Sequence, residues 1–131
     1  MGDIRLTVRV DFGSGAALGP GKIRLLEAIG TTGSISQAGR TLDMSYRRAW
    51  LLVDDMNRSF RVPVVTTQGG GNRGGGAMLT SFGRDLIDKY RAIEARATAA
   101  AAPQLRALET GLRRRVRKKP LKTSIRAATA K

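Results

Sequence analysis

Two serine residues that can each begin a helix stand close together in TTGSISQAGRTLDMSYRRAW, residues 31–50. A serine at a helix start accepts a hydrogen bond from a backbone N–H group that has no partner inside the helix. Ser34 is predicted to begin a short helix over residues 34–41, and Ser45 a longer helix that runs to about Phe60. Two short helices in such close succession predict a helix-turn-helix, in which the second helix enters a major groove of DNA.

The second helix is predicted to have an inward face and an outward face. Apolar residues at helical spacing define the inward face, which comprises Tyr46, Ala49, Trp50, Val53, Met56 or Asn57, and Phe60. We therefore expect Trp50 in the core, whereas the hydroxyl of Tyr46, at the helix start, could also reach a phosphate. Arg47 and Arg48 point elsewhere, and guanidinium groups match both phosphate oxygens and the acceptor edge of guanine. The candidate DNA-binding residues of this region are Ser34, Ser36, Ser45, Tyr46, Arg47 and Arg48.

The elements that precede this pair are predicted to be a strand and a helix. IRLTVRV, residues 4–10, alternates apolar and polar side chains as a half-buried strand does. Pro20 suits the first turn of a helix, because its missing N–H has no partner there in any case. The apolar stripe of this helix comprises Ile23, Leu25, Leu26 and Ile29. Gly30 and Gly33 are predicted to end it.

The elements that follow the pair are predicted to be a hairpin and a long helix. VVTTQ (64–68) and AMLT (77–80) are strand-like, and the glycine-rich GGGNRGGG (69–76) joins them, with Asn72 and Arg73 at its tip. Such a tip can place Arg73 and backbone amides near phosphates or in a minor groove. Thr80 or Ser81 begins a helix that continues into the alanine-rich stretch 95–102 as far as Pro103, and a separate brief helix is predicted over 104–112.

The predicted fold class is mainly α with a small β-sheet (α+β), a winged helix-turn-helix with a long C-terminal dimerisation helix. The winged-helix DNA-binding and dimerisation domain is assigned to residues 1–100, and residues 101–131 are assigned to a basic, Ala/Arg/Lys-rich tail that is expected to be largely disordered. Four apolar residues of the long helix form the predicted dimer seam, because one helix cannot hide both of its sides on so small a core: Leu86, Ile87, Tyr90 and Ile93.

The charge of the chain favours a polyanionic partner. It has 24 Lys and Arg against 10 Asp and Glu, a formal net charge of +14. Residues 101–131 hold ten of the basic side chains and one acid, so the excess lies mostly there. RRRVRKK (113–119) predicts phosphate affinity with a strong salt dependence and no sequence preference.

The composition removes several function classes. The chain has no Cys and no His, which excludes thiol nucleophiles, imidazole or thiolate metal sites and histidine acid–base catalysis. The neighbouring acids Asp54 and Asp55 have no nucleophile or set of metal ligands beside them, and the same holds for Asp85 and Asp88, so solvated or ion-paired helix faces are expected rather than a catalytic site. We therefore expect no enzyme, no metal site, no cofactor, no membrane partner and a cytoplasmic location.

Several of these motifs together resemble a known family. GSIS (33–36), MSYRRAW (44–50), the glycine-rich wing and the LTSFG stretch (79–83) look like the N-terminal DNA-binding domain of the molybdate-responsive transcriptional regulators of the ModE type, which are related to LysR-type winged helices. The resemblance spans roughly residues 20–95.

The resemblance implies a winged helix that dimerises through its N-terminal strand, first helix and long last helix, and that represses or activates genes, often for molybdate uptake. It implies that the helix from Ser34 to Thr41 supports the helix that follows it, and that Ser45 to Arg48 reads the groove. It also implies that Asn72 and Arg73 form the wing tip. Full-length members of the family continue into oxyanion-binding modules. Because this chain stops at residue 131, molybdate binding is not expected within it.

Together these features predict a homodimeric regulator that binds double-stranded DNA in a sequence-specific manner. Two alternatives stay open. One is a nonspecific nucleoid- or RNA-associated basic protein, in which residues 101–131 contribute most of the binding. The other is a protein-interaction module, in which the wing and the long helix contact a partner.

Overall fold

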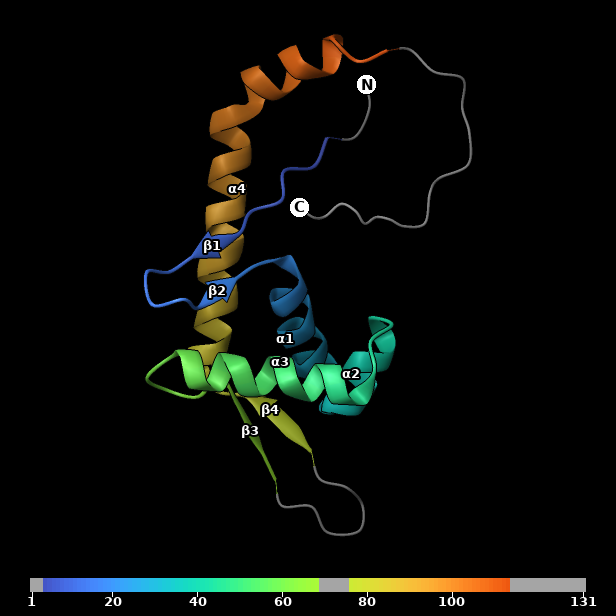
Figure 1. Cartoon of the computed structure of the whole chain (residues 1–131), viewed down its shortest axis with the longest axis vertical. Coiled ribbons are helices and arrows are strands. Elements are labelled where there is room, and N and C mark those ends of the chain that lie inside the picture. Colours follow the sequence, from blue (N-terminus) through green and yellow to red (C-terminus); the bar gives the residue numbers. More distant parts are fainter. Residues whose placement is uncertain (1–3, 69–75, 114–131) are drawn as a thin grey trace.

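The computed structural model describes residues 4–68 and 76–113 (Figure 1). In chain order the elements are β1 (Val10–Asp11), β2 (Ala17–Leu18), α1 (Pro20–Thr32), α2 (Ile35–Thr41), α3 (Tyr46–Ser59), β3 (Val65–Thr67), β4 (Ala77–Leu79) and α4 (Ser81–Thr110). The strands form two antiparallel pairs, β1–β2 and β3–β4, so the predicted α+β class is confirmed. In Figure 1, α4 runs along the long axis, α3 lies across it, and the β3–β4 hairpin projects beyond α3.

Helix α1 is the centre of the hydrophobic core. Its predicted stripe is fully buried: Ile23, Leu25, Leu26 and Ile29. Around it α1 contacts α2, α3, α4 and β4, so one helix joins the other elements of the domain. Burying a large apolar side chain of this kind contributes about 1.5–3 kcal/mol, so this stripe is a main source of stability.

The end of α1 differs from the prediction at one of its two glycines. Gly33 is the helix cap: it has a left-handed φ of 72°, and its N–H donates to the carbonyl of Ile29 at 2.8 Å. Gly30, in contrast, lies inside α1. A β-carbon there would stand 2.9 Å from Cδ1 of Leu79 on β4, so Gly30 permits a close approach of the wing to α1. The prediction that Gly30 ends the helix is therefore wrong.

The predicted strand over residues 4–10 is also wrong for most of its length. Only Val10 belongs to a strand, where it pairs with Leu18. A strand needs a neighbour that satisfies its backbone groups, and among the described residues Ile4–Arg9 have no such neighbour. One contact ties this segment to α4: the hydroxyl of Tyr90 donates to the carbonyl of Val8 at 2.6 Å.

Helix α4 is longer than predicted, because it continues through Pro103 to Thr110. The boundary placed between residues 100 and 101 therefore falls inside a helix, and no separate helix begins at residue 104. Proline lacks the N–H that would bond to the carbonyl four residues earlier, and it bends a helix. Figure 1 shows the last part of α4 turning away from the rest of the helix. Residues 114–131 lie outside the described residues.

Candidate nucleic-acid interface

Helices α2 and α3 form the predicted helix-turn-helix, and both serine caps are present. The Ser34 hydroxyl accepts from the N–H of Gln37 at 3.1 Å, and the Ser45 hydroxyl accepts from the N–H of Arg48 at 3.0 Å. In the turn, Asp43 has a φ of 58°, the left-handed region that Asp tolerates better than most residues. The two helix starts are therefore fixed by side-chain hydrogen bonds.

A close contact between the two helices sets the rotation of α3. A β-carbon on Gly39 of α2 would lie 3.1 Å from Cβ of Ala49, and both residues are buried. Only small side chains fit at such a distance. Ala49, Val53 and Met56 therefore face the core, as predicted for these three residues.

The predicted inward position of Tyr46 and Trp50 is wrong. Tyr46 is 58% exposed and Trp50 is 36% exposed, because the Gly39–Ala49 contact turns their side of α3 toward solvent. The indole N–H of Trp50 donates to the hydroxyl of Tyr46. Their rings meet edge to face, with centroids 6.4 Å apart and an interplanar angle of 78°. Two aromatic side chains thus form a joined pair on the surface of the helix.

Arg47 and Arg48 are exposed on the first turn of α3. Within residues 4–68 and 76–113, neither guanidinium group has an ion pair or a hydrogen bond. The first turn therefore presents Ser45, Tyr46 and both arginines to solvent. Ser34 and Ser36 are partly buried, and the Ser34 hydroxyl is already used as a cap, so these two serines are less available to a ligand.

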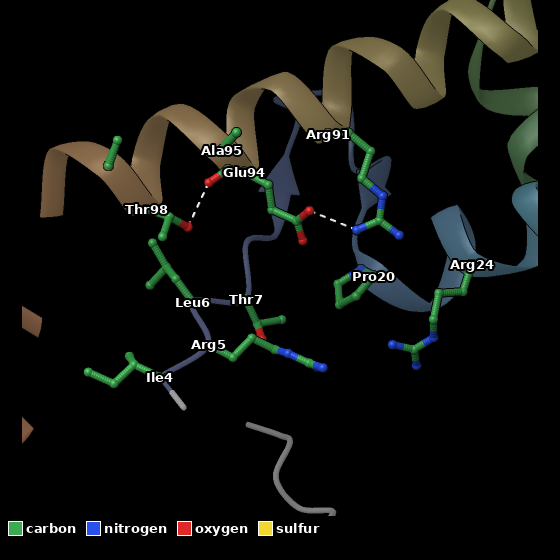
Figure 2. A pocket seen from close by; sticks show the side chains of 11 residues that line it. Ile4, Arg5, Leu6, Thr7, Pro20, Arg24, Arg91, Glu94, Ala95 and Thr98 are labelled. Carbon is green, nitrogen blue, oxygen red and sulfur yellow. Dashed lines mark hydrogen bonds and ion pairs between the residues drawn. The ribbon is translucent and has the colours of Figure 1, made fainter. Parts of the chain in front are cut away.

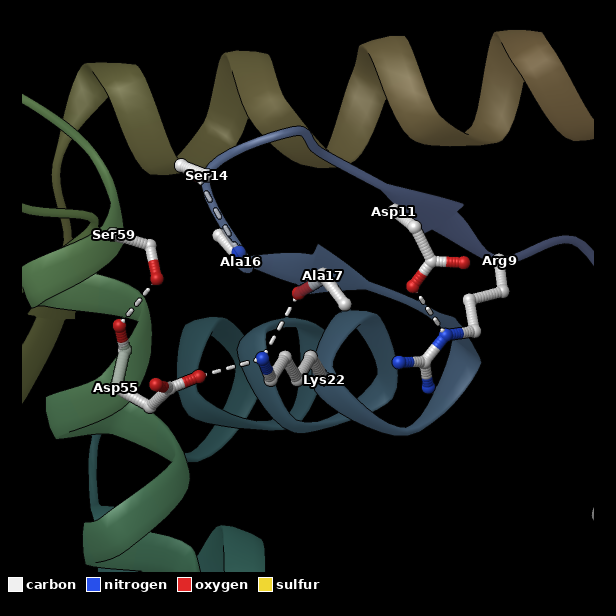
Figure 3. A network of polar contacts seen from close by, with 8 residues as sticks. All are labelled: Arg9, Asp11, Ser14, Ala16, Ala17, Lys22, Asp55 and Ser59. Atoms are coloured by element: carbon white, nitrogen blue, oxygen red, sulfur yellow. Dashed lines mark hydrogen bonds and ion pairs between the residues drawn. The ribbon is translucent and has the colours of Figure 1, made fainter.

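The acidic residues of α3 are neutralised by basic neighbours. Asp54 pairs with Arg58 one turn later, at 3.1 Å. Asp55 accepts from Lys22 of α1 at 2.7 Å, and the same ammonium group donates to the carbonyl of Ala17 (Figure 3). The expectation of ion-paired helix faces is confirmed for these two acids. Among the described residues, no group of His, Cys, Asp or Glu could hold a metal ion.

The wing follows α3 directly and is attached to it by Asn57. Oδ1 of Asn57 accepts from the N–H of Val64 at 2.7 Å and of Val65 at 3.2 Å, and Nδ2 donates to the carbonyl of Val65 at 3.0 Å. Strands β3 and β4 then pair as predicted, with Val65 opposite Leu79. The wing-tip residues Asn72 and Arg73 lie outside the described residues.

The four residues of the predicted dimer seam differ in exposure. Tyr90 is 1% exposed and packs inside the chain itself, so its predicted place on an outer seam is wrong. Burial raises the pKa of the Tyr90 hydroxyl, and the Glu94 carboxylate acts in the same direction. Leu86 and Ile87 are partly buried against the core, whereas Ile93 is 45% exposed. Ile93 is therefore the member of this set that offers most surface to a second chain.

A cavity of about 690 Å³ lies between residues 4–7, the start of α1 and the middle of α4 (Figure 2). In its wall, Arg91 bonds Glu27 of α1 through two nitrogens, at 2.7 and 2.9 Å, and Glu94 through a third at 2.7 Å. The hydrogen bonds to Glu27 and then to Glu94 raise the pKa of Arg91. The lining includes none of the predicted DNA-binding residues. In the part of the chain that the structure describes, no helix has the length and apolar character needed to cross a membrane.

Comparisons with known proteins find several relatives. No family model matches the chain. Over 82 residues it is 51% identical to the molybdenum-pterin-binding protein MopB of Rhodobacter capsulatus, covering 63% of this chain and 30% of that protein. It is 44% identical to the molybdenum transport protein ModE of Azotobacter vinelandii (65% and 32% covered), and 41% identical to the DNA-binding transcriptional dual regulator ModE of Escherichia coli (54% and 27% covered).

The matches therefore cover less than a third of the length of these relatives. The fold agrees with them, because a helix-turn-helix followed by a two-stranded wing is the architecture that the resemblance implied. Over the matched part, the chain is similar to the N-terminal region of ModE-type transcriptional regulators, and its winged helix-turn-helix is consistent with that likeness.

Proposed function

We propose that this chain is a sequence-specific DNA-binding regulator of transcription, and that α3 enters the major groove with its first turn leading. The observation that carries the proposal is the pair of exposed arginines, Arg47 and Arg48, which have no partner among the described residues. Two free guanidinium groups at the start of the second helix of a helix-turn-helix suit phosphate oxygens and guanine edges. The relatives that are named as transcriptional regulators support this class of function.

The proposal extends to the assembly and to the regulated genes. A homodimer would present two copies of α3 to successive major grooves, about 34–36 Å apart, on a palindromic site. The exposed Ile93 and the partly buried Leu86 and Ile87 of α4 support a contact between two copies. The name of one relative, a molybdenum transport protein, supports genes connected with molybdenum as the targets. A cytoplasmic location is part of the same proposal.

A nonspecific nucleic-acid-binding protein is the second candidate, and the net charge of +14 favours it. The two candidates differ in one measurable property. A specific regulator prefers its own site to random DNA by about 10³-fold or more at physiological salt, whereas a nonspecific protein has no such preference.

Selection of bound sequences from a random DNA library tests the proposal. We expect a palindromic consensus, whose two half-sites would also report a dimer. The double variant Arg47→Ala/Arg48→Ala should lose most of the preference for this site. Arg96→Ala, an exposed arginine on α4, is the matched control and should bind as the unchanged protein does. A selection without a consensus would favour the nonspecific protein, and no DNA binding even at low salt would favour a protein-interaction module.

A further inference from the structure

The exposed pair of Tyr46 and Trp50 has a chemical asymmetry. An indole N–H is a donor and has no acceptor atom, whereas a phenol hydroxyl both donates and accepts. Because Trp50 donates to Tyr46, the oxygen of Tyr46 is the acceptor in this bond. The hydroxyl hydrogen of Tyr46 is therefore free to donate, and it has no acceptor among the described residues.

Two positively charged residues share the first turn of α3 with Tyr46. Tyr46 precedes Arg47 and Arg48 directly, and Trp50 lies one helical turn after Tyr46 on the same exposed side of α3. A free O–H on the same exposed helix turn as two unpaired guanidinium groups suits an acceptor that is anionic, and phosphate oxygens are acceptors of this kind. Accepting a bond from Trp50 also polarises the Tyr46 hydroxyl, which makes it a better donor.

The exposure of Trp50 agrees with such a role. A tryptophan that is more than a third exposed leaves apolar surface in water, which folding alone does not favour. Its edge-to-face packing on the Tyr46 ring holds that ring against rotation, and its N–H holds the hydroxyl oxygen. The pair is thus ordered before any ligand arrives, which lowers the entropy cost of binding.

We propose that Trp50 is a positioning residue, which holds the hydroxyl of Tyr46 as a hydrogen-bond donor to a DNA phosphate. This inference rests on the proposed function, because it requires that α3 lies against DNA. It adds a role for Trp50 and assigns to Tyr46 a contact that fixes the helix on the backbone without reading a base.

The test measures binding of the selected DNA site and of random DNA by Tyr46→Phe, Trp50→Phe and the double variant. Tyr46→Phe removes one charge-assisted hydrogen bond and should weaken binding about tenfold or more, by the same factor on both DNAs. Trp50→Phe keeps an aromatic ring but loses the N–H, so it should cause a smaller loss. In the Tyr46→Phe background, Trp50→Phe should have no further effect.

A purely structural role for Trp50 predicts a different pattern. In that case Trp50→Phe would weaken binding equally with and without the Tyr46 hydroxyl, and this result would overturn the proposal. Trp50 is the only tryptophan of the sequence, so its fluorescence reports on the pair directly. We expect Tyr46→Phe to change the fluorescence emission of the protein without DNA. We also expect that adding DNA changes the fluorescence emission of the unchanged protein.

The failure of this inference can be distinguished from failure of the proposed function. If the unchanged protein shows no preference for any selected site, the regulator itself is in doubt. If it prefers a site but Tyr46→Phe binds as tightly as the unchanged protein, only the role of the pair is overturned.

Discussion

The side-chain oxygen of Asn57 in α3 lies 2.7 Å from the backbone nitrogen of Val64, and this hydrogen bond joins the helix-turn-helix to the wing. Two further bonds, to the N–H and the carbonyl of Val65, complete the link. Val64 and Val65 are both buried, so their backbone groups cannot use water instead. Asn57 therefore links α3 to the first residues of the wing through three hydrogen bonds.

Asn57→Ala is expected to lower the free energy of unfolding by about 1–3 kcal/mol, because buried backbone donors lose their acceptor. Urea denaturation measures this change. Arg58→Ala is the control on the next residue: it removes only the exposed ion pair with Asp54, and a loss of about 0.5 kcal/mol or less is expected. Equal effects of both substitutions would contradict the role given to Asn57.

Gly83→Ala is expected to destabilise the fold by about 1–3 kcal/mol, through overpacking against backbone that cannot move aside. A β-carbon on Gly83 would lie 2.3 Å from the carbonyl oxygen of Val64. Gly21→Ala is the matched control, because it also lies in a helix but has no atom within 4 Å of such a carbon. It should be neutral or stabilising by up to about 1 kcal/mol, since alanine favours helices. The melting temperature should therefore fall for Gly83→Ala and stay unchanged or rise for Gly21→Ala.

Tyr90→Phe is expected to change the pH dependence of stability. The folded pKa of Tyr90 is raised above its unfolded value of about 10. The stability from the neutral hydroxyl, which donates to Val8, is therefore fully present below about pH 10 and is lost as the pH rises through the folded pKa. Near pH 8 the free energy of unfolding of the unchanged protein should be about 1 kcal/mol higher than that of Tyr90→Phe.

Urea denaturation of both proteins at pH 8 and near pH 11 measures this difference. The advantage of the unchanged protein should shrink at the higher pH. Titration of lysines affects both proteins alike, so it cancels in the comparison. An advantage that stays constant across this range would show that the hydroxyl does not ionise in a way linked to folding.

Removal of residues 113–131 is expected to weaken binding to all DNA sequences together. This segment has nine Lys and Arg and no Asp or Glu. Each phosphate that it neutralises contributes about 0.9 to the slope of log K against log salt, so the truncated chain should show a flatter slope. Fluorescence anisotropy over a salt series measures both quantities. A truncation that weakened only specific binding would contradict this electrostatic role.

Local chemistry made several elements predictable. Ser34, Ser45 and Thr80 each cap a helix where their sequence position indicated, because a cap depends on hydrogen bonds within a few residues. Gly33 and Pro20 mark the ends of α1 for equally local reasons. Of the candidate DNA-binding residues, Ser45, Tyr46, Arg47 and Arg48 all lie exposed on the first turn of one helix, although their contact with DNA stays a prediction.

The sequence by itself thus determined the order of the helices, their caps and the pairing of the wing, since these follow from interactions between near neighbours along the chain. Only the tertiary structure decided which side of α3 is buried. Helical spacing alone allows Trp50 to face inward, but the close contact of Gly39 with Ala49 leaves no room for a large side chain there and turns Trp50 outward. Likewise, the alternation in residues 4–9 does not make a strand without a neighbouring strand to complete its backbone hydrogen bonds.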